Sequence, residues 1–116
     1  KVFNNGDLSR DFTYVDDIVA GVVATLLENS NDKLLYKLYN IGNSAPVQLM
    51  DFIKSIENNL GLLAEKEMLP MQDGDVHQTW ADVSRLQKDY NYKPNTSVEK
   101  GVEAFVNWYK MYYNIK

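Results

Sequence analysis

The sequence predicts an α/β fold that is mostly helical, with a few short and scattered strands. Three segments with apolar residues at helical spacing are longer than any segment with strand-like alternation. The chain has 116 residues, of which 45% are hydrophobic, enough to form a core. It contains no internal repeat and no low-complexity tract. We therefore expect one lobe over residues 1–116.

The first fifteen residues predict extended chain interrupted by a turn. Residues 1–5 are strand-like, Gly6 and Asp7 mark a turn, and Arg10 follows in a polar loop. Phe12, Tyr14 and Val15 then make a brief β-like run.

A first helix is predicted over residues 16–28. Its apolar residues fall on one stripe, made of Ile18, Val19, Val22, Val23, Leu26 and Leu27. Asp16 and Asp17 open it at the positive end of the helix dipole, although a catalytic carboxylate pair is the other interpretation. A polar loop is predicted at residues 29–32, and alternation predicts a strand at residues 36–41.

A second helix is predicted over residues 48–60, where apolar residues recur at helical spacing, and Gly61 is a suitable left-handed C-terminal stop. Residues 65–69 predict a short strand that Pro70 closes. Residues 71–75 form a turn-rich loop, and residues 76–81 are compatible with an extended segment.

Two more helices complete the chain. Asp82 is a suitable N-cap for a short helix to residue 90, with Val83 and Leu86 pointing inward. Thr96 and Glu99 have capping-box spacing at the start of a last helix, which runs to residue 112. Its predicted inner face comprises Val98, Val102, Phe105, Val106, Tyr109 and Tyr112. Gly101, inside that helix, indicates a close contact.

Composition excludes several classes of partner and site. A net charge of -4 and a pI near 4.9 argue against a nucleic-acid or anionic-membrane surface. The chain has no cysteine and a single histidine, His77, so we expect no metal site. It has no apolar run near 20 residues and no signal peptide, so we expect a cytoplasmic protein. The strand-like start at Lys1 suggests that an N-terminal portion precedes it.

Arg10 is the first candidate binding residue. Its planar guanidinium, between a turn and a helix start, suits phosphate or carboxylate oxygens in a bidentate contact. The alternative is a loop arginine that pairs with the neighbouring Asp7 or Asp11.

Asp75 is the second candidate. It follows Gly74, which allows a sharp turn, and its carboxylate could accept hydrogen bonds from vicinal hydroxyls of a ribose or sugar. The alternative is a turn aspartate that bonds its own backbone. No role is assigned to His77. The sequence has no glycine-rich dinucleotide turn, no Ser-His-Asp arrangement and no Tyr-x-x-x-Lys, so we expect neither catalytic nor cofactor-binding residues in this chain.

Four segments together resemble NAD-dependent sugar-nucleotide epimerases and dehydratases of the extended short-chain dehydrogenase/reductase superfamily. They are residues 4–19 (NNGDLSRDFTYVDDIV), residues 39–49 (YNIGNSAPVQL), residues 72–82 (QDGDVHQTWAD) and residues 93–102 (KPNTSVEKGV). Within the superfamily the likeness is greatest to the UDP-glucuronate 4-epimerases. The resemblance implies the C-terminal lobe of such an enzyme, with the Rossmann domain missing from this chain.

The same resemblance implies roles for three residues. Arg10 matches the arginine that grips the UDP diphosphate, and Asp75 matches the acidic residue that holds the uridine ribose. Gln72 stands where related UDP-galactose epimerases have a phosphate-binding arginine, so its contact to the diphosphate would be weaker.

The implied parent enzyme interconverts UDP-glucuronate and UDP-galacturonate through a 4-keto intermediate. It uses NAD, which this chain alone would not bind, and it is a homodimer. The chain would bind the UDP-sugar, pack against the missing Rossmann domain and be inactive alone. A UDP-sugar decarboxylase or dehydratase lobe and a stand-alone binding module are the alternatives.

Overall fold

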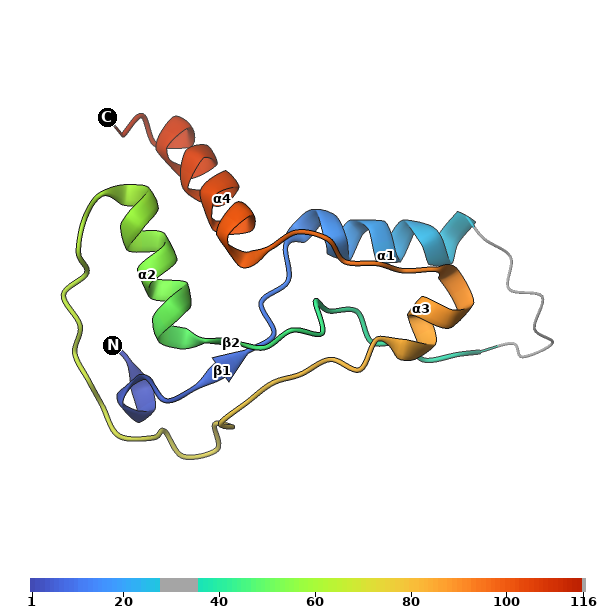
Figure 1. Cartoon of the computed structure of the whole chain (residues 1–116), viewed down its shortest axis with the longest axis horizontal. Helices are drawn as coiled ribbons and strands as arrows, with labels where there is room; N and C mark the ends of the chain where they lie inside the picture. The colour runs from blue at the N-terminus through green and yellow to red at the C-terminus, as the bar shows by residue number, and fades with distance from the viewer. Residues whose placement is uncertain (28–35, 116) are drawn as a thin grey trace.

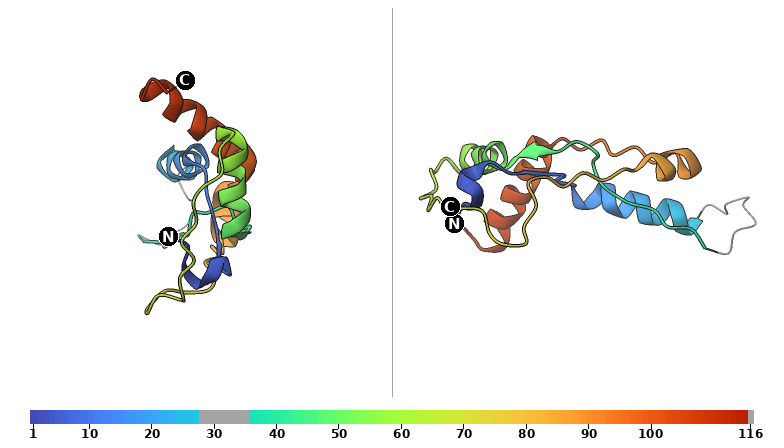
Figure 2. Two further views of the ribbon diagram at one scale, coloured as in Figure 1. Left: turned by 90° about the vertical axis from the view of Figure 1, so that its left-hand side faces the viewer. Right: turned by 90° about the horizontal axis from the view of Figure 1, so that it is seen from below.

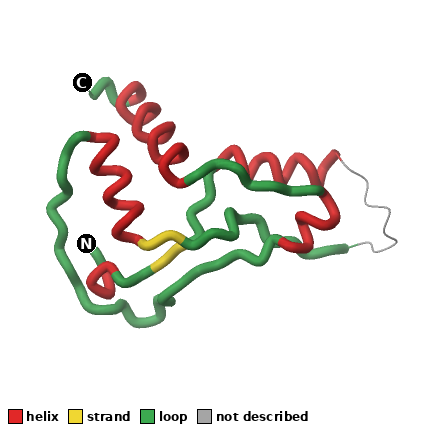
Figure 3. Tube along the Cα trace, in the orientation of Figure 1, coloured by secondary structure: helices red, strands yellow, loops and turns green. Residues whose placement is uncertain are grey.

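A computed structural model describes residues 1–27 and 36–115. These residues form a 3-10 turn, η1 (Phe3–Gly6), two short strands, β1 (Ser9–Arg10) and β2 (Val47–Gln48), and four helices, α1 (Val15–Leu27), α2 (Leu49–Leu60), α3 (Ser84–Tyr90) and α4 (Val98–Tyr112). The strands pair antiparallel, with Ser9 opposite Gln48 and Arg10 opposite Val47. The predicted fold class, mostly helical with short strands, is confirmed (Figure 1, Figure 3).

The elements lie in two groups on either side of the small sheet. Helices α2 and α4 lie with η1 on one side, and α1 and α3 lie on the other (Figure 1). The molecule is thin along its shortest axis, with extents of 53 × 37 × 18 Å, as the side views of Figure 2 show. β1 therefore lies at the junction, where segments from both groups meet.

One core forms around α3. Val83, Leu86 and Tyr92 are buried together, and the partly buried residues around them are Tyr39, Ile41, Ala81 and Tyr90. The prediction that Val83 and Leu86 point inward is confirmed. The predicted N-cap is wrong by one residue: Val83 occupies the N-cap position, and Asp82 before it accepts a hydrogen bond at Oδ1 from Ser84 N at 3.0 Å. The helix itself begins at Ser84, two residues later than Asp82.

The second group is built on the packing of α2 against α4. Val102 and Val106 are buried on α4, and Lys110 Nζ donates to the Asn59 carbonyl at 3.1 Å. A Cβ on Gly101 would lie 3.1 Å from the Tyr14 ring, so the predicted close contact is present. Helix α2 matches its prediction, and Gly61 ends it in the left-handed conformation, at φ 71°.

The start of α4 differs from the prediction by one residue. The N-cap is Ser97, whose Oγ accepts a hydrogen bond from Lys100 N at 3.3 Å, and not Thr96. Thr96 N instead donates to Asp17 Oδ2 at 3.1 Å, which holds Thr96 outside the helix. The predicted inner face is also too wide, because Phe105, Tyr109 and Tyr112 are exposed.

The predicted strand at residues 36–41 is wrong, since that segment has no ladder partner among the described residues. Side-chain hydrogen bonds to α3 hold residues 38 and 39 in place instead. Tyr39 OH donates to Asp89 Oδ2 at 2.8 Å, and Arg85 Nη1 donates to the Leu38 carbonyl at 3.1 Å. The Leu38 carbonyl thus has a side-chain donor in place of a ladder partner.

Two other strand predictions are only partly met, and a third, at residues 12–15, is wrong. Residues 65–69 contribute a single parallel bridge, from Met68 to Val2, in place of a strand. The strand-like start is interrupted after Val2 by η1, in which Asn4 and Asn5 both have φ of 49°. Asparagine tolerates this left-handed conformation better than most residues, which a β-propensity argument does not detect. The β-like run at residues 12–15 is loop followed by the first residue of α1.

Helix α1 covers its predicted span as far as Leu27, and Glu28 and the predicted loop at residues 29–32 lie outside the described residues. Its apolar stripe is largely exposed: Leu26 is 76% exposed and Leu27 is 78% exposed. No helix in the described parts of the chain is both long and apolar enough to cross a membrane.

Candidate functional site

The Arg10 guanidinium and the Asp75 carboxylate meet, although 65 positions separate them in the sequence. Arg10 Nη2 lies 2.8 Å from Asp75 Oδ1. Arg10 Nη1 also donates to the backbone carbonyls of Ser9, at 2.8 Å, and His77, at 3.2 Å. Three acceptors therefore fix the orientation of the guanidinium. Both side chains of the pair remain partly accessible to solvent, at 23% and 34%.

This pairing tests the alternative interpretation of Arg10 as a loop arginine paired with a neighbouring aspartate. The proposed ion pair with Asp7 or Asp11 is wrong, because the partner of Arg10 is Asp75. Sequence neighbours in an extended strand point to opposite faces, so Asp11 could not follow Arg10 to the same side.

Backbone pairing explains why the two segments are adjacent. Ser9 in β1 forms a parallel bridge with Gln78. Ser9 N donates to the His77 carbonyl at 2.9 Å, and Thr79 N donates to the Ser9 carbonyl at 3.2 Å. β1 is thus held between β2 on one side and residues 77–79 on the other (Figure 1). The predicted extended segment at residues 76–81 pairs at this one point.

The Asp75 loop closes as a tight turn. Gly74 has φ of 82°, and Asp75 N donates to the Gln72 carbonyl at 3.1 Å. Asp75 Oδ1 accepts hydrogen bonds from both Arg10 and the backbone N of Val76, the latter at 2.8 Å. Asp75 therefore stabilises its own turn and contacts Arg10 at once. Gln72 is exposed and contributes its backbone carbonyl to that turn.

His77, to which the sequence analysis assigns no role, contributes its backbone to the site. Its carbonyl accepts from Ser9 N and from Arg10 Nη1. Its ring is exposed and lies beside Asn4, with Nδ1 at 3.4 Å from Asn4 Nδ2. Every residue type has a backbone carbonyl, so the sequence does not reveal a contribution of this kind.

Two aspartates have positions that sequence patterns do not indicate. Asp11 accepts from the backbone N atoms of Asn43, Ser44 and Ala81, at 3.0 to 3.1 Å. Asp17, which is buried, accepts from the backbone of residues 95 and 96 at the entry to α4.

Asp16 and Asp17 lie in the first turn of α1, as the helix-dipole interpretation predicts. The Asp17 carboxylate is used to hold the entry to α4, which does not fit a catalytic carboxylate pair. Burial raises the pKa of the nearby Tyr92 hydroxyl, and the Asp17 and Asp11 carboxylates raise it further. That hydroxyl donates to the Gly42 carbonyl at 3.1 Å, which suits a structural role.

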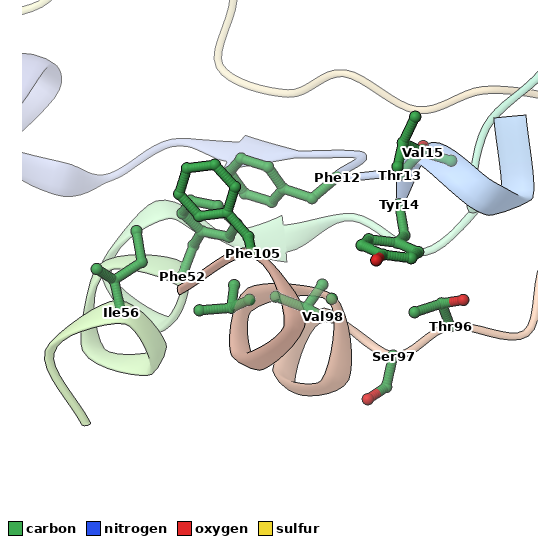
Figure 4. A pocket seen from close by; sticks show the side chains of 12 residues that line it. Phe12, Thr13, Tyr14, Val15, Phe52, Ile56, Thr96, Ser97, Val98 and Phe105 are labelled. Carbon is green, nitrogen blue, oxygen red and sulfur yellow. The ribbon is translucent and has the colours of Figure 1, made fainter. Parts of the chain in front are cut away.

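A separate apolar pocket of about 460 Å³ lies between α2, α4 and the start of α1. The rings of Phe12 and Phe52 stack in it with centroids 3.9 Å apart, and Phe105 lies beside them (Figure 4). None of the side chains that line this pocket is charged. It therefore offers no counter-charge for a diphosphate, unlike the surface around Arg10.

Comparison with known proteins identifies the family. A family model described as GDP-mannose 4,6 dehydratase matches residues 1–105. The chain belongs to this family. It is accordingly an extended short-chain dehydrogenase/reductase sequence, as the four motifs indicate.

Relatives and solved structures in the family agree with this assignment. The chain is 44% identical over 109 residues to an uncharacterized protein of Methanocaldococcus jannaschii, covering 94% of this chain and 32% of the relative. It is 37% identical over 121 residues to a UDP-glucuronate 4-epimerase of Arabidopsis thaliana, covering 96% and 28%. The crystal structure of UDP-glucuronic acid 4-epimerase from Bacillus cereus, in complex with UDP-glucuronic acid and NAD, superimposes with a TM-score of 0.85 at 34% identity, covering 97% and 35%.

The chain spans about a third of the length of these family members. The relatives therefore contain long regions that have no counterpart among residues 1–116.

Proposed function

We propose that this chain is the nucleotide-sugar-binding lobe of an NAD-dependent UDP-sugar 4-epimerase acting on UDP-glucuronate and UDP-galacturonate. The observation that carries the proposal is the contact between Arg10 and Asp75 at 2.8 Å. A diphosphate and a ribose are adjacent in UDP, so their protein partners must also be adjacent. Relatives named UDP-glucuronate 4-epimerases support the choice of sugar nucleotide.

In the proposed complex, a diphosphate oxygen takes the place of Asp75 at Arg10 Nη2. The guanidinium keeps its backbone contacts at Nη1 and can offer Nη2 to the ligand. Asp75 is then free to accept hydrogen bonds from the ribose hydroxyls. The exchange replaces one charge-assisted bond of Arg10 by another, and the released Asp75 carboxylate keeps the hydrogen bond from Val76 N. Gln72, three residues before Asp75 in the same turn, would add a neutral donor to the diphosphate.

Firm anchoring of the nucleotide serves the proposed chemistry. Epimerisation at C4 through a 4-keto sugar requires the hexose to present both faces in turn while UDP stays bound. Contacts to the non-reacting diphosphate and ribose position the reacting carbon without restraining the hexose.

The residues of this chain do not fit NAD. Its glycines, at positions 6, 21, 42, 61, 74 and 101, are dispersed singly, and none forms the glycine-rich turn between a strand and a helix that holds a pyrophosphate. We therefore derive no catalytic step within this chain and assign it binding alone. The proposed enzyme holds NAD on a Rossmann domain.

The exposed face of α1 fits packing against that domain. Val19, Val22 and Val23 are each more than 40% exposed, and the last turn of the helix is more exposed still. A contiguous apolar surface of this kind marks an interface. We place the Rossmann domain there and assign no dimer contact to this chain.

The test is a calorimetric titration of UDP into the chain and into its Arg10→Ala variant. Loss of a charged hydrogen bond to the diphosphate should weaken binding by about 2 kcal/mol, or about thirtyfold in Kd. Arg85→Ala is the matched control. Arg85 is the other arginine of the chain and contacts the Leu38 carbonyl near α3, so its variant should bind UDP as the unmodified chain does.

If both arginine variants lost the same UDP affinity, the loss would reflect only the change in net charge, and Arg10 would not be part of the site. A chain without measurable UDP affinity would overturn the proposal itself.

A further inference from the structure

Asp11 joins three segments of the chain beside the Arg10–Asp75 pair. Its Oδ1 accepts from Asn43 N at 3.1 Å, and its Oδ2 accepts from Ser44 N and from Ala81 N, each at 3.0 Å. Its own backbone N donates to Thr79 Oγ1 at 3.1 Å. One side chain thus gathers three backbone N–H groups, and the residue bonds both to the loop at 42–44 and to residues 79–81.

The surroundings of this carboxylate leave little space for a ligand atom. A Cβ on Gly42 would lie 2.9 Å from Asp11 Oδ2 and 2.5 Å from Ala81 Cβ, so glycine is required there. With three N–H donors in place, the two carboxylate oxygens are already used by the protein. Asp11 therefore acts on the site through its neighbours.

Those neighbours carry the proposed nucleotide contacts. Arg10 immediately precedes Asp11, and Asp75 lies at the start of the segment that contains Thr79 and Ala81. The same segment supplies the His77 carbonyl that accepts from Arg10 Nη1 at 3.2 Å. Moving residues 79–81 away from Asp11 would separate the partners of Arg10 from its guanidinium.

We propose that Asp11 is a positioning residue that sets the spacing between Arg10 and Asp75, so that affinity for a nucleoside diphosphate depends on it. This inference rests on the proposed function. Replacing the carboxylate by an amide keeps the shape but substitutes an NH2 group for one acceptor. Even with the amide oxygen toward Ser44 N and Ala81 N, the NH2 group would face the N–H of Asn43, which would keep only Thr13 Oγ1, at 3.0 Å, as its acceptor. The segment around Arg10 and the segment at residues 75–81 should then move apart.

The experiment compares Asp11→Asn with Asp17→Asn in UDP titrations of the full chain. Asp17 is a matched control, because its carboxylate also accepts backbone N–H groups, from Asn95 and Thr96, but holds the entry to α4. We expect Asp11→Asn to weaken UDP binding about tenfold, within the range of coupling between residues of one network. Asp17→Asn should change it by less than about twofold.

A double-mutant cycle separates positioning from general loss of structure. In an Arg10→Ala background, with titrations followed by NMR into the millimolar range, Asp11→Asn should have less than about a twofold further effect. Asp11 acts through Arg10, so its contribution disappears when Arg10 is absent. A full tenfold loss in that background would overturn the inference.

Thr79 provides a milder variant that tests the same contact if Asp11→Asn does not fold. Thr79→Val removes the acceptor for Asp11 N and should weaken UDP binding by about threefold, whereas Thr79→Ser should restore it. Equal affinities for the Val and Ser variants would contradict a positioning role, as would unchanged affinity in Asp11→Asn. Absence of UDP binding by the unmodified chain would overturn the proposed function instead.

Discussion

Arg10 is oriented before any ligand arrives. Its Nη1 contacts two backbone carbonyls and its Nη2 contacts Asp75, and Asp75 is itself held by its turn. Both side chains are partly exposed, so the ion pair alone adds little to folding stability. In the proposed complex the contact with Asp75 is exchanged for one with the diphosphate, whereas the two Nη1 contacts stay. These backbone contacts preorganise the guanidinium, since a side chain that is already fixed loses less entropy on binding.

A second cluster of charged and polar side chains has a structural role and a predicted pH dependence. Lys37 Nζ and Tyr39 OH both donate to Asp89 Oδ2, at 2.9 and 2.8 Å. The hydrogen bond from Lys37 lowers the pKa of Asp89 most, and the bond from Tyr39 lowers it further. Burial and the bond to Asp89 raise the pKa of Tyr39 to about 12.

We predict that Asp89→Asn destabilises the chain at neutral pH and that the difference shrinks in acid. The folded-state pKa of Asp89 lies below its unfolded value, so its contribution is complete above an unfolded pKa of about 3.9 and is lost as pH falls through the folded pKa. Urea unfolding at a series of pH values measures this. Tyr39→Phe, which keeps Lys37, should show the same trend with smaller amplitude. A difference independent of pH would contradict this assignment.

The candidate residues differ in how far the sequence predicts them. Arg10 and Asp75 were identifiable because each follows turn residues and has a chemistry that suits a nucleotide. Their direct contact was not, since it depends on the pairing of Ser9 with residues 77–79. Asp11 was missed because its partners are backbone N–H groups, which every residue type except proline provides.

At the scale of elements, the helices follow local signals and the extended segments do not. Helix α2 begins after Gln48 and ends at Gly61, as apolar spacing and a left-handed stop predict. Residues 36–41 alternate like a strand but are held by side chains of α3 and its flanks. Alternation reports which faces differ in polarity, and it does not report whether a neighbouring strand exists.

The start of α4 gives a prediction that distinguishes two capping residues. Ser97 Oγ accepts from Lys100 N, so Ser97→Ala should lower the free energy of unfolding by about 1 kcal/mol. Thr96→Ala is the matched control and should have a smaller effect, because Thr96 contacts Asp17 through its backbone N, which alanine keeps. Chemical denaturation measures both. A larger loss for Thr96→Ala would restore Thr96 as the cap.

At the scale of the whole molecule, the chain is open rather than spherical. Its radius of gyration is 17.3 Å, against roughly 13 Å for a compact domain of this length. Helix α1 exposes most of its apolar side chains, and relatives are about three times as long. Sequence periodicity identifies that stripe as apolar but does not specify which surface covers it.

The central claim concerns where UDP binds, and amide NMR spectra of the chain during a UDP titration test it most directly. We predict saturable shifts at residues 8–11 and 72–81, with the C-terminal half of α4 unaffected, and no saturable shift in a parallel titration with NAD. Shifts centred on the apolar pocket between Phe12, Phe52 and Phe105, or no saturable shift with UDP, would contradict the account.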